Sequence, residues 1–435
     1  MPTAVLETHI GIVLLAGERA YKIKKPVRTA FLDFSTLAKR RVTCEREVAL
    51  NRRLAPDVYL GVGTSPAPAG AAGPAEPVVV MRRMPEERRL STLGSAGSAV
   101  SGDLRALARL MAAFHAGAHR GPAVVADGTA EALRLRWTAN IAELSPYAGT
   151  VLDEALVSAV ERMALRFIDG RAPLFADRIA HNRIVDGHGD LIADDVFCLD
   201  DGPRVLDCLE FDDRLRHVDG LDDVAFLVMD LYRLGYPDLA ARFLDDYVEF
   251  AADPAPAALW HHFVAYRAVV RAKVACIRHG QGDPSAAAHA ASYASLGLRH
   301  LELGAVRLAL VGGLPGTGKT TLGGALADRF GAVLISSDRV RKELAGIELK
   351  GRSLVIGATL PGGDLHRREH GARVRRAAPP RRSAAGARRV RRARRVLDRR
   401  PTPAGRGAAG RAHPQRPGPA ALPHHAREGG CADRH

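Results

Sequence analysis

The stretch GHGDLIADDVFCLDDGPRVLDCLEFD, residues Gly187 to Asp212, decides how the chain is interpreted. Asp190 follows a His-Gly pair, and Asp207 ends a short apolar run that comes after an Asp-Gly turn. Two carboxylates on neighbouring loops suit phosphoryl transfer to a hydroxyl: one takes the proton of the acceptor, and the other holds magnesium on the nucleotide phosphates. The pattern therefore predicts a kinase-type site in which these two aspartates divide the chemistry.

The same stretch resembles the catalytic loop of the aminoglycoside phosphotransferase-like kinases, relatives of the protein kinases. Their pattern is H-G-D-x-x-x-x-N, followed by a strand that ends in a metal-binding Asp. His188, Gly189 and Asp190 match it, and Asp207 falls in the metal position, so the resemblance implies that His188 and Asp190 are catalytic. One position departs from the pattern. Asp195 stands where the family usually has Asn, which keeps a metal-ligating oxygen but adds a negative charge beside Asp207.

Two upstream segments extend the resemblance. RAYKIKKPV resembles the strand that carries the phosphate-gripping lysine, with Lys22 preferred and Lys24, on the same strand face, as the alternative. EREVALNRRL resembles the helix whose glutamate pairs with that lysine, and Glu47 aligns better than Glu45. The resemblance thus implies an ATP-binding role for Lys22 and Glu47.

Further segments bear on the fold. VVVMRRM (Val78–Met84) lies where an adenine-contacting hinge is expected, and VDGLDDVAFL carries Asp222 and Asp223, which would brace the catalytic loop. YRAVVRAKVAC also resembles the family, with no chemistry assigned to it. The resemblance implies an α+β, bilobal, protein-kinase-like domain over residues 1–303, with a β-rich N-lobe to about residue 90 and a mostly α C-lobe over 91–303.

Periodicity in the sequence predicts the same division. Two runs of β-favouring residues on either side of Gly17 predict a β-hairpin, and residues 36–55 predict a helix that Ser35 or Thr36 caps. Between 183 and 216 the helical pattern breaks, and two short strands are expected. Leu, Ala and Val recur at helical spacing over residues 101–180 and 222–303.

A second motif lies near residue 315. GGLPGTGKTT contains a complete G-x-x-x-x-G-K-[ST] P-loop, placed between a predicted strand, VRLALVG, and a predicted helix, TTLGGALADRF. The glycines let backbone N–H groups surround phosphates, Lys319 reaches the outer phosphates, and the Thr320 hydroxyl ligates magnesium. The candidate nucleotide-binding residues here are Gly313, Gly316, Gly318, Lys319, Thr320 and Thr321.

A second predicted strand, AVLISSD, leads to Asp338 and begins an α/β unit over residues 304–360. The segment resembles the small P-loop kinases and zeta-toxin-like phosphotransferases, which implies that Asp338 activates an acceptor hydroxyl and that Arg341 contacts phosphate. The alternative role of Asp338 is to cap a helix before Arg339. A kinase-like domain followed by a P-loop kinase domain resembles a family of two-domain bacterial ATP-binding proteins, over roughly residues 1–345.

The basic charge of the chain is confined to its last part. Residues 361–435 contain 20 Arg, no Lys and 5 acidic residues, so the formal net charge of +15 lies there and residues 1–360 are neutral. This segment, which includes ARRVRRARRVLDRR, has no Ile, Phe, Tyr or Trp and is expected to be disordered because it cannot build a core. Arg, Ala, Pro and Gly, which dominate the segment, are the amino acids of GC-rich codons, and the lack of Lys and aromatic residues is not typical of a nucleic-acid arm, so we favour a frameshifted or truncated P-loop domain.

These features narrow the class of protein. The five cysteines form no CxxC pair, and no apolar run approaches the 18 or so residues of a membrane span, so a cytoplasmic protein is expected. The leading hypothesis is a phosphotransferase that uses ATP and Mg²⁺ on a small hydroxyl-bearing substrate, without a membrane or a specific nucleic acid as partner. The alternative is a nucleotide-binding regulatory protein that transfers no phosphate.

Overall fold

The computed structural model describes residues 4–7, 11–28, 33–65, 75–94, 100–330 and 332–345. The chain divides into two units, residues 1–307 and 308–435, and each is described by itself. The expected disordered tail, residues 361–435, lies outside the described residues.

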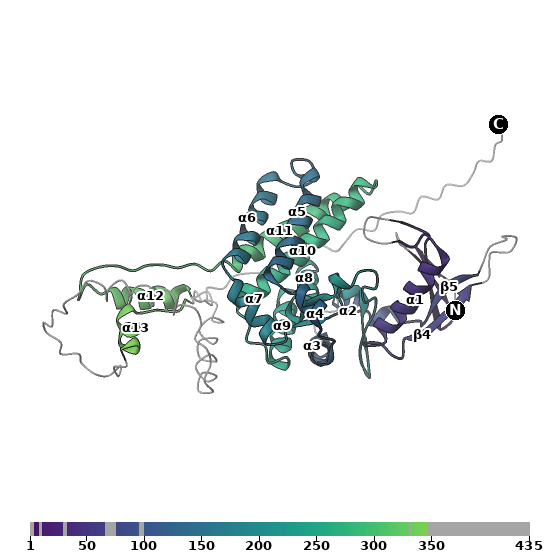
Figure 1. Ribbon diagram of the computed structural model, residues 1–435, viewed down its shortest axis with the longest axis horizontal. Helices are drawn as coiled ribbons and strands as arrows, with labels where there is room; N and C mark the ends of the chain where they lie inside the picture. Colours follow the sequence, from purple (N-terminus) through teal and green to yellow (C-terminus); the bar gives the residue numbers. More distant parts are fainter. Residues whose placement is uncertain are drawn as a thin grey trace, which may run out of the picture. The chain divides into compact units, whose positions relative to one another are not determined.

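A five-stranded antiparallel sheet forms the N-lobe of the first unit, in the order β1-β2-β3-β5-β4 (Figure 1). The predicted hairpin is confirmed, since β2 and β3 are joined by a two-residue turn in which Gly17 has φ +57°, a value that favours glycine. The strands are β1 Ala4–Glu7, β2 Gly11–Ala16, β3 Arg19–Lys24, β4 Tyr59–Ser65 and β5 Glu76–Arg82.

One helix, α1 (Leu37–Asn51), packs on β4 and β5. Of the two predicted caps, Thr36 is the one used, because its hydroxyl accepts a hydrogen bond from the Lys39 amide at 3.3 Å. Cys44 and Val48 on α1 pack with Tyr59 and Val79 of the sheet in a small core. This packing fixes the face of α1 that carries Glu47.

The C-lobe is mostly helical, as predicted, and α8 lies at its centre (Figure 1). Residues 220–231 of α8 are all buried, as expected of a helix surrounded by other helices. The helices are α2 Leu90–Gly94, α3 Val100–Gly117, α4 Pro122–Asp127, α5 Ala130–Leu144, α6 Glu154–Asp169, α7 Ala172–Ala180, α8 Gly220–Arg233, α9 Pro237–Phe250, α10 Ala257–Gly280 and α11 Ala286–Leu303. Single 3₁₀ turns occur at η1 Glu86–Arg88, η2 Ser145–Tyr147, η3 Ala193–Asp195 and η4 Asp213–Leu215.

The segment between α7 and α8 contains two small antiparallel ladders. The first pairs β6 (Ile184–Asp186) with β9 (His217–Asp219), and the second pairs β7 (Val196–Leu199) with β8 (Gly202–Val205). Within residues 183–216, where two strands were predicted, three form, and β9 follows directly after them. Their connecting loops carry Asp190 and Asp207.

A buried ion-pair group fixes the start of α8. The Asp219 carboxylate caps this helix by accepting the Leu221 amide at 2.9 Å, and it also accepts Arg178 Nε at 2.7 Å. A second buried carboxylate, on Asp253, accepts Arg178 Nη2 at 2.6 Å. Because buried charges are tolerated only when they are paired, this group holds the start of α8 in place beneath the catalytic loop.

In the second unit the described residues form α12 (Lys319–Phe330) and α13 (Ser337–Leu344). The strands predicted before and after α12 are not formed, which corrects the sequence-based prediction. The physical reason is the lack of a partner: a strand needs a neighbour for its N–H and C=O groups, and none is present among residues 308–345 as described. The apolar side chains that a sheet would have buried are instead exposed to solvent, Leu308 by 79% and Leu310 by 87%.

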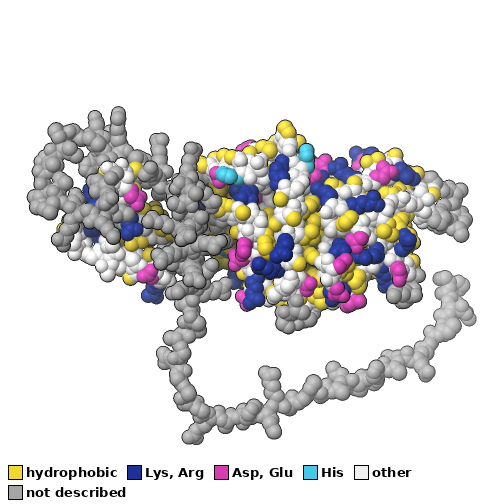
Figure 2. Space-filling view, turned by 90° about the horizontal axis from the view of Figure 1, so that it is seen from below, with side chains coloured by type: hydrophobic (Ala, Val, Ile, Leu, Met, Phe, Trp, Pro, Cys, Tyr) yellow, Lys and Arg dark blue, Asp and Glu magenta, His cyan; other side chains and the backbone are white. Residues whose placement is uncertain are grey.

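The surface agrees with the charge count for residues 1–360. On the face shown in Figure 2, basic and acidic side chains of the first unit lie interspersed and do not gather into one basic surface. Within the part of the chain that the structure describes, no helix has the length and apolar character needed to cross a membrane.

Candidate active site

Both candidate lysines on β3 contact the same glutamate. Lys22 Nζ lies 2.9 Å from Glu47 Oε1, and Lys24 Nζ lies 2.5 Å from Glu47 Oε2, since residues two apart on a strand share a face. These are ion-pair contacts without hydrogen-bonding geometry at the Glu47 oxygens. Glu45, the other candidate, is exposed. The structure thus brings Glu47 to the lysines.

The two lysines differ in what else they touch. Lys22 also pairs with Asp207, whereas Lys24 is buried and pairs with Glu210. Burial opposes the charge on Lys22, but Asp207 and Glu47 outweigh it and hold its pKa well above the usual value. Both lysines thus join the sheet to this loop, but only Lys22 contacts the predicted metal ligand Asp207 itself.

Glu210 was not among the predicted site residues. Burial raises its pKa, and the Lys24 ammonium opposes that rise. The signal for it in the sequence was its place three residues after Asp207, on the same loop.

The candidate catalytic loop, residues 188–190, is held in place through hydrogen bonds to its backbone amides. Asp223 accepts the amides of His188 and Gly189, each at 2.8 Å, so the predicted bracing role of Asp223 is confirmed. Gly189 has φ +89°, and a Cβ there would lie 3.2 Å from the Leu215 carbonyl oxygen. Only glycine fits this position without strain.

Asp222 supports the same loop through an arginine. Arg267 Nε donates to Asp222 Oδ1 at 2.8 Å, and Arg267 Nη1 donates to the Gly189 carbonyl at 3.2 Å. This gives a structural role to the YRAVVRAKVAC segment, which sequence reasoning could not assign. Asp223 is further fixed by His115 Nε2 at 2.9 Å, a contact that sequence reasoning missed.

His188 is fully buried and its ring contacts backbone. Its Nε2 lies 3.0 Å from the Leu206 carbonyl oxygen, so this nitrogen carries the proton and donates. Burial lowers the pKa of His188 and favours the neutral ring. The structure places His188 where it ties the catalytic loop to the segment before Asp207, so we expect it to position these loops rather than to contact a substrate.

Asp190 lies on the loop surface, half buried. Burial raises the pKa of its carboxyl group, and the nearby Arg271 partly opposes that rise. A carboxylate with a raised pKa is a better proton acceptor, as a general base requires. The geometry is compatible with the predicted role.

Asp207 and Asp195 are the predicted metal ligands. The Asp207 side chain is 48% exposed, and its backbone has φ +62° with its amide donating to the Tyr59 hydroxyl at 3.1 Å. Burial, then the charges of Asp207 and Asp190, raise the pKa of Asp195 well above its usual value. The three carboxylates therefore lie close enough to repel one another.

A bound cation would relieve the repulsion between these carboxylates. Their oxygen atoms suit a magnesium ion, which proteins usually hold through one or two carboxylates together with nucleotide phosphates. Among the described residues, no three His, Cys, Asp or Glu side chains are arranged to hold a metal by themselves. A site completed by phosphate oxygens agrees with both observations.

The P-loop residues are all exposed or half buried. Gly316 and Gly318 each have φ +79°, which the tight loop requires, and Lys319 begins α12 with its ammonium on the Leu314 carbonyl. Thr320 and Thr321 follow in the first turn of α12, and Gly313, the first residue of the P-loop motif, has φ +153°.

Asp338 does not cap α13. The Ser336 hydroxyl is the cap, accepting the Arg339 amide at 3.4 Å, which overturns the capping alternative for Asp338. Asp338 lies in the first turn, where its carboxylate pairs with Arg341 at 2.6 Å and with Lys342 at 3.0 Å. Its role as an activating base stays a prediction.

The chain is similar to a known protein family and to solved structures. The family described as "AAA domain" matches residues 308–399. Among solved structures, a choline/ethanolamine kinase family protein from Mesorhizobium loti is 14% identical with a TM-score of 0.42, covering 70% of this chain and 93% of that one. A putative aminoglycoside phosphotransferase from Ralstonia eutropha JMP134 is 15% identical with a TM-score of 0.40, covering 69% and 93%.

Three mycobacterial proteins share more of the sequence. Uncharacterized proteins Mb2027c of Mycobacterium bovis and MT2060 and Rv2004c of Mycobacterium tuberculosis are each 49% identical over 340 residues, which is 78% of this chain and 68% of theirs. The chain therefore belongs to the same family as these mycobacterial proteins.

Proposed function

We propose that the first unit is a phosphotransferase that moves the γ-phosphate of ATP to a hydroxyl group of a small molecule. The observation that carries this proposal is that Lys22 of β3 contacts both Glu47 of α1 and Asp207, whose loop is hydrogen-bonded to the loop that carries Asp190. Lysine, glutamate and two aspartates brought together from distant parts of the chain are the groups that phosphoryl transfer requires.

Each residue would have one task. Lys22, held by Glu47, would bind nucleotide phosphates, and Asp207 with Asp195 would hold Mg²⁺, which supplies positive charge to the transferring phosphate. Asp190 would orient the acceptor hydroxyl and take its proton. Asp223 and His188 would keep the two loops in register through the backbone contacts described above.

The proposal is tested by measuring ADP release from ATP and Mg²⁺ with panels of sugars, aminoglycosides and nucleosides. Release that an acceptor stimulates, and that disappears in Asp190→Asn, would support transfer. Tight ATP binding without stimulated release by any acceptor class would favour a second function instead.

That second function is a nucleotide-binding regulatory protein. The observation in its favour is Asp195, whose carboxyl group has a raised pKa where the resembled kinases have a neutral Asn. Asp195→Asn separates the two: an active kinase should keep or gain turnover, whereas a regulatory protein should show ATP binding with no turnover in either form.

The lysines allow a paired prediction. Lys22→Met should lower kcat/KM for ATP by about 10- to 100-fold and should cost less stability than the Lys24 change, because the Lys22 side chain is 14% exposed and its partner Asp207 is 48% exposed. Lys24→Met should instead lower the free energy of unfolding by about 3–5 kcal/mol, because it leaves Glu47 and Glu210 buried with one cation fewer. Steady-state kinetics and urea unfolding of both variants check this. If Lys24→Met is the kinetically damaging change, the assignment of the phosphate-binding lysine is wrong by two residues.

The P-loop gives a contrasting prediction. Lys319→Ala in the full chain should change ATP affinity little, because a phosphate cradle is only as ordered as the sheet that holds it. Calorimetric titration should give about one ATP per chain for both proteins. Two ATP per chain, falling to one in Lys319→Ala, would contradict this and show a working P-loop site.

We also place this activity in the cytoplasm. The four cysteines among the described residues, Cys44, Cys198, Cys208 and Cys276, are buried and unpaired, which agrees with a reducing compartment.

A further inference from the structure

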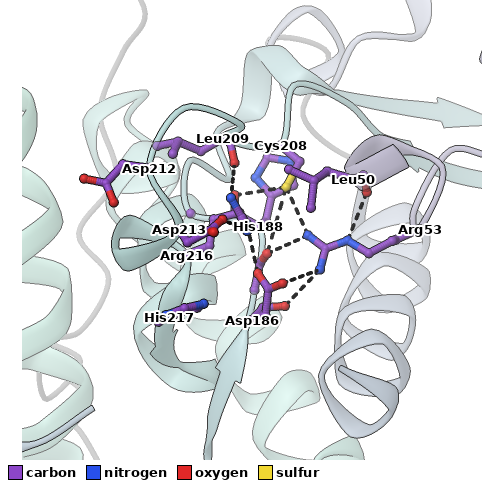
Figure 3. A network of polar contacts seen from close by, with 12 residues as sticks. Leu50, Arg53, Asp186, His188, Cys208, Leu209, Asp212, Asp213, Arg216 and His217 are labelled. Carbon is purple, nitrogen blue, oxygen red and sulfur yellow. Dashed lines mark hydrogen bonds and ion pairs between the residues drawn. The ribbon is translucent and has the colours of Figure 1, made fainter. Parts of the chain in front are cut away.

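Arg53, in the turn after α1, reaches from the N-lobe to the backbone of the catalytic loop (Figure 3). Its Nη1 donates to the Asp186 carbonyl oxygen at 3.1 Å, and its Nη2 donates to the Gly187 carbonyl oxygen at 2.9 Å. Nη2 also lies 3.2 Å from Cys208 Sγ, next to Asp207 in the chain. One guanidinium group therefore contacts both loops of the candidate site.

The contacts on the two sides of the catalytic loop are complementary. From the C-lobe, Asp223 accepts the amides of His188 and Gly189, and from the N-lobe, Arg53 donates to the two carbonyls just before them. A planar fork of donors matches two consecutive carbonyl oxygens in a way that a flexible ammonium cannot. The loop is thus held between an anion of one lobe and a cation of the other.

A chain of charges continues from Arg53 beneath the loop (Figure 3). Arg53 Nη1 lies 3.5 Å from Asp186 Oδ2, while Arg216 Nε donates to Asp186 Oδ1 at 2.8 Å. Arg216 is buried and also pairs with Asp213, which in turn pairs with Arg46 of α1. This series of ion pairs therefore begins at Arg53 and ends at Arg46, which lie on either side of Glu47 in the sequence.

A neutral side chain completes the connection. Asn51, buried at the end of α1, donates to the Glu47 carbonyl oxygen at 2.9 Å and accepts the Cys208 amide at 2.9 Å. Asn51 thus links the backbone of Glu47 to that of Cys208, the residue after Asp207. Lys22 makes a second link, because it contacts the side chains of Glu47 and Asp207. Asn51 therefore connects α1 to the loop that carries Asp207, while Arg53 connects it to the backbone just before His188.

We propose that Arg53 is a positioning residue that couples α1 of the N-lobe, and with it Glu47, to the backbone of the catalytic loop. The kinetic part of this proposal rests on the proposed phosphotransfer. Arg53 acts through the backbone carbonyls of Asp186 and Gly187, and in this way it sets the distance between the phosphate-binding lysine and Asp190. Rates of transfer depend steeply on that distance, since a misplacement of about 1 Å can cost about 10²-fold.

The test compares two neighbouring arginines. Arg52 also donates to two consecutive carbonyls, of Tyr59 at 2.8 Å and Leu60 at 2.6 Å, but both belong to β4 of the N-lobe. Arg53→Met should lower kcat by about 10- to 100-fold while the KM for ATP changes less than about threefold. Arg52→Met should leave both values near wild type, and Arg53→Lys should recover part of the loss.

Hydrogen exchange supplies a readout that needs no turnover. In Arg53→Met, and more weakly in Arg53→Lys, the amides of residues 188–190 should exchange faster than in the wild-type chain, whereas Arg52→Met should leave them unchanged. Unchanged exchange at these amides in a folded Arg53 variant, or equal loss of kcat in the two Met variants, would overturn the proposal. Wild-type protein without turnover would refute the phosphotransferase assignment, and the exchange comparison would still decide the coupling.

Discussion

Asp190→Asn is expected to reduce ATP-dependent transfer by about 10²- to 10⁴-fold, because it removes the proposed acceptor of the substrate's hydroxyl proton. Nucleotide affinity should change little, since Lys22, Glu47 and Asp207 remain in place. Kinetics with saturating acceptor and equilibrium binding of ATP separate the two quantities. A variant that keeps more than half of the wild-type turnover would show that Asp190 is not the base.

The raised pKa of Asp190 adds two expectations. The base works when ionised, so the activity should fall as the pH drops through a pKa above the ordinary range for aspartate. A raised pKa in the folded state also means that the ionised form costs folding free energy at neutral pH. Asp190→Asn should therefore not lower the melting temperature at pH 7, and a marked loss would contradict a carboxyl group whose ionisation burial opposes.

Asp207→Asn is the second large effect, and turnover that depends on Mg²⁺ should fall by at least about 10²-fold. Asn is a better test than Ala, because residue 207 has φ +62°, a conformation that Asn tolerates and Ala does not. Titration of Mg²⁺ provides the check: high Mg²⁺ should restore part of the activity of Asp207→Asn and none of that of Asp190→Asn.

Stability should also distinguish Asp207 from Asp190. Burial opposes ionisation of Asp207, but Lys22 and Lys24 outweigh it and lower its pKa. A lowered pKa means that the carboxylate stabilises the fold above its unfolded pKa and that this contribution is lost as the pH falls. Asp207→Asn should thus lower the melting temperature slightly at pH 7, by a small amount because solvent screens a half-exposed group. An increase would contradict the Lys22 contact.

Local rules determine much of the first unit. The hairpin at Gly17 and the cap at Thr36 depend only on residues next to them in the chain, and both are confirmed. The catalytic loop is equally readable, because His188, Gly189 and Asp190 are adjacent and Gly189 needs a positive φ. The lobes, the loop and the bracing Asp223 can therefore be named from the sequence alone.

Contacts between distant residues could be decided only by the tertiary structure. Lys22 and Lys24 share a strand face, and only the position of the loop carrying Asp207 distinguishes them, because Lys22 meets Asp207 and Lys24 meets Glu210. Arg53 looks like one more surface arginine in its sequence context, since its partners at Asp186 and Gly187 are more than a hundred residues away.

The segments around α12 show the reverse case. Their runs of apolar residues favour strands, yet no strand forms among the described residues of the second unit. A helix closes its own backbone hydrogen bonds, so α12 and α13 form without partners, whereas a strand must find its partners elsewhere. The sequence by itself determined the helices, the turns and the chemistry of each loop. The packing of distant segments decided which lysine, which glutamate and which arginine meet at the site.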